Sequence, residues 1–138
     1  MDNVYFPQEG AKAALDAFLA STDGPVYARL YDNAVSFDPT RTLADYNEAS
    51  FTGYNPVGPI TWPAASINGE GKAQADSPAL DFTFTGGAGT ATVQGLYFTD
   101  DANTVLIAVV PLVGAMVLTP AQPTLSRIVA MTDVGELV

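Results

Sequence analysis

The stretch LDFTFT at residues 80–85 decides the fold class. Its apolar positions alternate with polar ones without a break: Leu80, Phe82 and Phe84 against Asp81, Thr83 and Thr85. Successive side chains of a β-strand point to opposite faces, so this alternation predicts a strand with one buried and one solvated face. Such strands are typical of antiparallel sheets.

Short β-forming runs flank this strand on both sides, separated by Gly, Pro, Asn and Asp. About seven or eight strands follow from this spacing, which predicts a mainly β chain folded as an antiparallel β-sandwich or a squashed barrel. The runs 86–89 and 100–103 are predicted to be hairpin turns. The other predicted strands cover residues 26–32, 72–75, 91–99, 104–111, 115–118 and 125–132.

One helix is predicted near the start of the chain, at about residues 7–21. Its apolar residues recur with the period of a helix, and the segment Asp23–Gly24–Pro25 would end it. The stripe consists of Ala11, Ala14, Leu15, Phe18 and Leu19. With 138 residues in all, the chain is expected to form a single β-rich domain, 1–138.

Residues 102–126 carry no formal charge. Their apolar part, Val105–Leu118, is interrupted by Pro111 and Gly114 and is shorter than the roughly 20 residues of a spanning helix. We therefore expect buried strands here and no membrane span.

Composition excludes several kinds of chemistry, because the chain has no His and no Cys. Zinc fingers, haem and iron–sulfur ligation, Cys nucleophiles and His-based acid–base catalysis are excluded. The formal net charge is −10, and the five Lys and Arg residues are widely spaced. Nucleic acids and anionic membranes are not expected partners, since both attract clustered cations.

Paired carboxylates are the remaining acid–base groups, at Asp45 with Glu48 and at Asp100 with Asp101. Such pairs can hydrolyse glycosides, but a helix cap and a hairpin loop are the favoured interpretations. The segment 100–103 lacks the ligand spacing of a calcium loop, and residues 86–89 lack the context of a phosphate loop. We expect no enzyme activity, no catalytic residues, no metal and no cofactor.

Aromatic residues gather in the middle of the sequence, at Tyr46, Phe51, Tyr54 and Trp62. A core or subunit-contact cluster is the favoured interpretation. The alternative is a ligand platform of Tyr46, Tyr54 and Trp62 that stacks on sugar rings, as in a carbohydrate-binding β-sandwich module.

The apolar lead Val4–Tyr5–Phe6 precedes the predicted helix. Free termini usually fray unless they are tied down. Together with Leu15 and Phe18 of the helical stripe, Val4, Tyr5 and Phe6 are therefore predicted to contact a neighbouring subunit or a capsid.

Four further segments stand out in the sequence: TLADYNEASFTGY at 42–54, GLYFTDD at 95–101, LYDN at 30–33 and LTP at 118–120. Together they resemble small β-rich structural proteins of tailed bacteriophages, the head decoration (cement) or tail proteins encoded near the head and tail genes. The resemblance implies a non-catalytic role in the virion, most specifically as a capsid decoration protein, with a small tail or fibre component as the alternative. It implies contacts with the major capsid protein, other virion proteins or copies of the chain itself, after assembly in the host cytoplasm.

Overall fold

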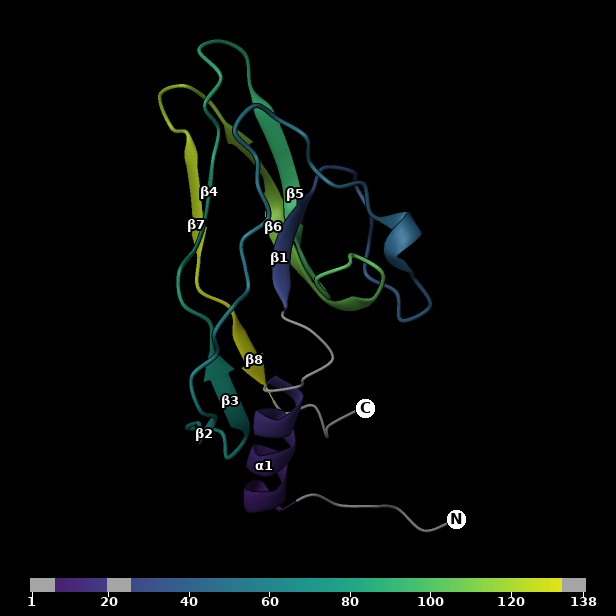
Figure 1. Cartoon of the computed structure of the whole chain (residues 1–138), viewed down its shortest axis with the longest axis vertical. Helices are drawn as coiled ribbons and strands as arrows, with labels where there is room; N and C mark the ends of the chain where they lie inside the picture. The colour runs from purple at the N-terminus through teal and green to yellow at the C-terminus, as the bar shows by residue number, and fades with distance from the viewer. Residues whose placement is uncertain (1–6, 20–25, 133–138) are drawn as a thin grey trace. The chain divides into compact units, whose positions relative to one another are not determined.

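The computed structural model describes residues 7–19 and 26–132 (Figure 1). These residues are mainly β, with helix α1 at Gln8–Leu19 and strands β1 to β8 arranged in several antiparallel sheets. The apolar stripe predicts a helix at residues 7–21, and α1 lies within that range. No helix among the described residues is long and apolar enough to cross a membrane.

The described residues fall into two compact units. Unit 1 contains α1, β2 (Ser66–Ile67), β3 (Ala73–Asp76) and β8 (Ala130–Thr132). Unit 2 contains β1 (Tyr27–Tyr31), β4 (Leu80–Thr83), β5 (Ala91–Thr99), β6 (Leu106–Leu118), β7 (Thr124–Arg127) and the short 3₁₀ helix Leu43–Asp45. The single domain expected over residues 1–138 stays a prediction.

In unit 1, β2, β3 and β8 form a three-stranded sheet. Small buried residues, Ala65, Ala73 and Ala75, form its core, and Trp62 and Met131 pack against them. Helix α1 contacts β3, and the Asp16 carboxylate accepts a hydrogen bond of 2.6 Å from the Ala65 amide. That hydrogen bond lowers the pKa of Asp16 and joins the helix to the segment that leads into β2.

The larger sheet of unit 2 has the order β1-β5-β6, with both pairs antiparallel. Its central strand is buried at five consecutive residues, from Gly95 to Thr99. A strand covered on both faces does not need to alternate, which explains the continuous run GLYFT. Gly95 lies opposite Tyr31 in the register, and a Cβ at this position would collide with the Tyr31 ring.

The second sheet of unit 2 pairs β4 with β7 (Figure 1). The alternation predicted for residues 80–85 is confirmed, because Leu80, Phe82 and Phe84 are buried while the three polar residues are exposed. The predicted hairpin at residues 86–89 is wrong. Strand β4 pairs with β7 and not with β5, so these glycines lead the chain from one sheet to the other.

None of the three sheets closes into a barrel among the described residues, so the squashed-barrel alternative is wrong. In the larger sheet, the outer edge of β1 is covered by the chain's own loop through bridges to Glu48 and Val57. The outer edge of β6 pairs with no strand of the described chain.

Residues 106–118 of the uncharged stretch form one long strand, β6, where two strands were predicted. The expectation that it is buried is wrong for most of its length, because Leu118 is its only fully buried residue. The reason is its place in the sheet. An edge strand that bulges has neighbours on fewer sides than a central strand.

Candidate functional site

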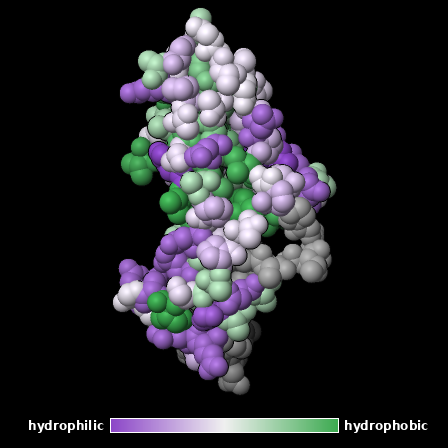
Figure 2. All heavy atoms as spheres, turned by 60° about the vertical axis from the view of Figure 1, so that its left-hand side comes forward, coloured by the Kyte–Doolittle hydropathy of each residue, from purple (hydrophilic) through white to green (hydrophobic). Residues whose placement is uncertain are grey.

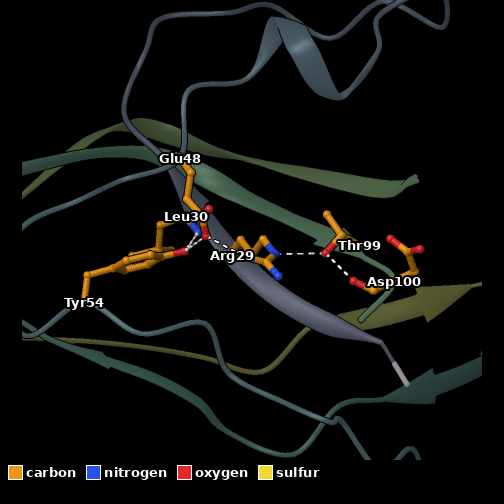
Figure 3. Close-up of polar contacts among 6 residues, drawn as sticks. All are labelled: Arg29, Leu30, Glu48, Tyr54, Thr99 and Asp100. Atoms are coloured by element: carbon orange, nitrogen blue, oxygen red, sulfur yellow. Dashed lines mark hydrogen bonds and ion pairs between the residues drawn. The ribbon is translucent and has the colours of Figure 1, made fainter. Parts of the chain in front are cut away.

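The most extensive polar cluster of unit 2 surrounds Arg29 on β1 (Figure 3). The Arg29 guanidinium donates from Nε to Thr99 Oγ1 and from Nη1 to Glu48 Oε2, at 2.9 Å each. The Tyr54 hydroxyl donates to the same Glu48 oxygen at 2.7 Å and accepts from the Leu30 amide at 3.2 Å. The guanidinium is nearly buried, with 11% of its side chain exposed, against 30% for Glu48.

This cluster fastens the loop of residues 47–57 to strand β1. Backbone hydrogen bonds run beside it, from the Ala49 amide to the Leu30 carbonyl and between Ala28 and Val57 in both directions. Burial and the bond to Glu48 raise the pKa of Tyr54, and burial raises the pKa of Tyr97 to about 12. Both phenols therefore keep their protons at neutral pH, and the Tyr54 hydroxyl donates its proton to the Glu48 carboxylate.

Of the four carboxylates in the two pairs found in the sequence, three have separate structural tasks, while Asp101 is an exposed residue of the β5–β6 turn. Asp45 accepts from the Thr42 amide at 2.8 Å, at the start of the 3₁₀ helix, while Glu48 binds Arg29. Asp100 accepts from the amides of Thr104, at 2.7 Å, and Val105, at 3.0 Å, and from the Thr104 hydroxyl. These hydrogen bonds lower the pKa of Asp100 and close the β5–β6 turn.

No metal site accompanies these carboxylates. Within residues 7–19 and 26–132, no group of three or more acidic, His or Cys side chains is placed to hold a metal ion.

The aromatic residues of the candidate ligand platform lie in three different surroundings. Tyr46 is buried against Tyr31 and Tyr97, so it does not present a ring face at the surface. Tyr54 is partly buried and stacks on Phe82 with 6.2 Å between ring centroids. Trp62 belongs to unit 1 and packs against its alanine core.

Tyr46 carries a buried hydroxyl that makes no hydrogen bond within the described structure. An unsatisfied buried polar group costs about 1–3 kcal/mol. We expect Tyr46→Phe to leave the free energy of unfolding unchanged or to raise it by up to about 1 kcal/mol. The matched variant Tyr54→Phe should lower it by about 1–2 kcal/mol, because that hydroxyl makes two hydrogen bonds. Urea unfolding of both variants measures the difference, and equal losses would contradict the prediction.

The predicted subunit-contact residues are only partly within the structure. Val4, Tyr5 and Phe6 lie outside the described residues, and Leu15 and Phe18 lie in α1. Their role in contacts stays a prediction.

An exposed apolar feature on β6 was not predicted. Between the pairs Val93–Met116 and Gly95–Pro111, strand β5 advances by two residues while β6 advances by five. Residues 112–115, which we call the β6 bulge, therefore stand out from the sheet. Val113 at the bulge is fully exposed, and Gly114 has a φ of +88°, a conformation that favours glycine.

Two shallow hollows flank the β6 bulge. One is lined by residues 111–116 and by Arg127. The other, which we call the neutral hollow, has no charged residue among its lining side chains. They include Tyr31, Ala34, Val35, Gln94, Pro111 and Leu112.

Figure 2 shows hydrophobic residues gathered on a visible face of unit 2. The sequence features that could have indicated the β6 bulge are the lack of charge over residues 102–126 and the presence of Pro111 and Gly114 within that stretch.

Comparisons of the chain with protein-family models, with curated proteins and with solved structures find no match.

Proposed function

We propose that this chain is a non-catalytic structural protein of a tailed-phage virion, most specifically a capsid decoration protein. The contact-forming part of the proposal is supported by the exposed, uncharged strand β6 and its bulge. The virion part is supported by the resemblance of residues 30–33, 42–54, 95–101 and 118–120 to phage structural proteins. A decoration protein acts through contact area, and so needs a surface of this kind more than it needs a reactive site.

The exposure of Val113 carries the proposal. Burying a valine side chain contributes about 1.5–3 kcal/mol, and this one remains in water at the tip of a bulge. On the same strand, Leu106 to Val110 are partly exposed, and Leu106 and Val109 also pack against the buried tyrosine cluster. An exposed apolar surface without charge is typical of a protein interaction site.

The polar clusters support a structural role over a catalytic one. Glu48, Asp45 and Asp100 each bind structural partners within the chain. Their hydrogen bonds fasten a loop, start a 3₁₀ helix and close a turn. Carboxylates held in this way are poorly placed to exchange protons with a substrate.

We also propose that unit 2 is a β-sandwich, with the β1-β5-β6 sheet facing the β4-β7 sheet, and that α1, in unit 1, is the single N-terminal helix predicted for the chain. The burial of Leu30, Phe98 and Val93 in one sheet and of Leu80, Phe82 and Leu125 in the other supports a shared core. The ring contacts of Tyr54 with Phe82 and with Phe51 lie within the same unit.

Carbohydrate binding is the second candidate function. It is favoured by a shallow hollow of unit 2 that combines a carboxylate, hydroxyls and an aromatic ring. The lining includes Asp32, Ser50, Phe51, Thr90 and Thr92. A glycan array tests it, and binding that is lost in Phe51→Ala would favour this candidate over the first.

Mass spectrometry of purified virions tests the main proposal, using the phage whose genome encodes the chain. We expect the chain in the particles at a copy number comparable to that of the major capsid protein. A tail component would be present in far fewer copies. Particles that lack the chain would contradict a virion role altogether.

A further inference from the structure

The turn between β2 and β3 contains the only asparagine in the sequence that is followed by glycine, Asn68 before Gly69. The Asn68 carbonyl accepts from the Gly71 amide at 3.0 Å, and the Asn68 amide donates to the Lys72 carbonyl at 2.8 Å. Asparagine at the first position of a turn and glycine at the last are typical of a type I turn. The turn therefore holds Asn68 in one main-chain conformation.

The carboxamide of Asn68 is also held, at both its oxygen and its nitrogen. The oxygen, Oδ1, accepts from the Glu70 amide at 2.9 Å and from the Lys72 amide at 3.0 Å. The nitrogen, Nδ2, donates to Gln74 Oε1 at 3.0 Å. Two amide donors aimed at one carbonyl oxygen stabilise the negative charge that forms on that oxygen when a nucleophile attacks its carbon, Cγ.

The amide nitrogen of Gly69 is the nucleophile next to this carbon along the chain. Gly69 is exposed, and its amide has no hydrogen-bond partner among the described residues. The space beside it is open, because a Cβ at this position would meet no atom within 4 Å. A group held next to its target reacts far faster than the same group on a separate molecule.

We propose that Asn68 is a modification site at which the folded chain loses ammonia without the help of an enzyme. The Gly69 nitrogen forms a bond with Asn68 Cγ, the Cγ–Nδ2 bond breaks, and the side-chain nitrogen leaves as ammonia with the proton that Gly69 gives up. The product is a cyclic imide. Water then adds to either carbonyl of the imide, and the ring opens to aspartate or to isoaspartate. Water is the only co-reactant.

Both products add one negative charge to a chain whose formal net charge is already −10. Aspartate still accepts from the two amides but no longer donates to Gln74. Isoaspartate lengthens the main chain within the turn, and so is expected to weaken the two residue pairs that join β2 to β3. The site belongs to unit 1, whereas the β6 surface that supports the proposed function belongs to unit 2.

Peptide mapping by mass spectrometry tests the proposal on the purified full chain, incubated folded at mildly alkaline pH. Digestion after Lys and Arg releases residues 42–72, whose asparagines are Asn47, Asn55 and Asn68. We expect a mass gain of about 1 Da that fragmentation assigns to Asn68. Asn47 and Asn55 are internal controls and should stay unchanged over the same time. A sample digested without incubation gives the starting level.

Gly69→Ala is the matched variant. Gly69 is not among the glycines with a positive φ, and its surroundings are open, so alanine fits the turn. Its methyl group hinders the approach of the nitrogen to Cγ, and we expect the reaction to slow at least about tenfold. Circular dichroism checks that the variant is folded.

A synthetic peptide of residues 64–74 measures what the fold contributes. Because the turn supplies two donors to Oδ1, the folded chain should react at least as fast as the peptide. An unchanged Asn68, an equal rate in Gly69→Ala, or a folded chain that reacts more slowly than the peptide would overturn the proposal. None of these results bears on whether the chain is found in virions, so the two proposals fail separately.

Discussion

The Phe82→Ala variant is expected to lose about 3–5 kcal/mol of unfolding free energy. Phe82 is 2% exposed, lies on β4 and stacks on the Tyr54 ring. Alanine removes the transfer free energy of the ring and leaves a cavity between residues that cannot fully collapse into it. Urea unfolding followed by near-UV circular dichroism of tyrosine measures the loss in unit 2, where Tyr27, Tyr31, Tyr46, Tyr54 and Tyr97 lie.

Thr83→Ala is the matched control for this variant. Thr83 is the next residue on β4 and points to the solvated face, so its replacement should cost less than about 0.5 kcal/mol. Fluorescence of the single tryptophan, Trp62, reports on unit 1 in the same samples. Similar losses in the two variants would show that the assignment of the buried face is wrong.

The Glu48→Ala variant is expected to lose about 2–3 kcal/mol, the second-largest effect. It leaves the nearly buried Arg29 guanidinium without its counterion and takes the acceptor from Tyr54. Removing one partner of a fully buried ion pair costs about 3–5 kcal/mol, and the partial exposure of Glu48 reduces this. The loss should appear in urea unfolding.

The double variant Arg29→Met with Glu48→Leu separates the charge effect from simple loss of contact. Replacing both partners by apolar groups of similar size should cost less than either single change, because no charge is left unpaired. Additive losses would show that Arg29 and Glu48 act independently, and that the loop of residues 47–57 is held in another way.

Local alternation was enough to predict which face of β4 is buried. Leu80, Phe82 and Phe84 had to lie on one side because of the two-residue period of a strand, whatever the strand packs against. The turn at residues 100–103 is equally local, since Asp100 binds atoms only four and five residues away. The same holds for the pair of Thr42 and Asp45.

The candidate sites depend on contacts between residues that lie far apart in the sequence. The sequence therefore predicted these sites less well than it predicted the faces of β4. Arg29 meets Thr99 across 70 positions and Glu48 across 19, so no local pattern identifies that cluster. The candidate aromatic platform combined residues that share a region of the sequence. The structure places Tyr46 in a buried tyrosine cluster and Trp62 against the alanine core of unit 1.

The sequence by itself determined the mainly β character, the two-faced strand at residues 80–85 and the absence of His and Cys chemistry. These properties depend on neighbouring residues or on composition alone. Only the tertiary structure decided that β4 pairs with β7, and that β6 is an edge strand with Val113 exposed. An uncharged apolar run has the same pattern whether it lies in the centre or at the edge of a sheet. Its exposure depends on whether distant strands pair with both of its edges. Within the described chain, β6 pairs along one edge only, with β5.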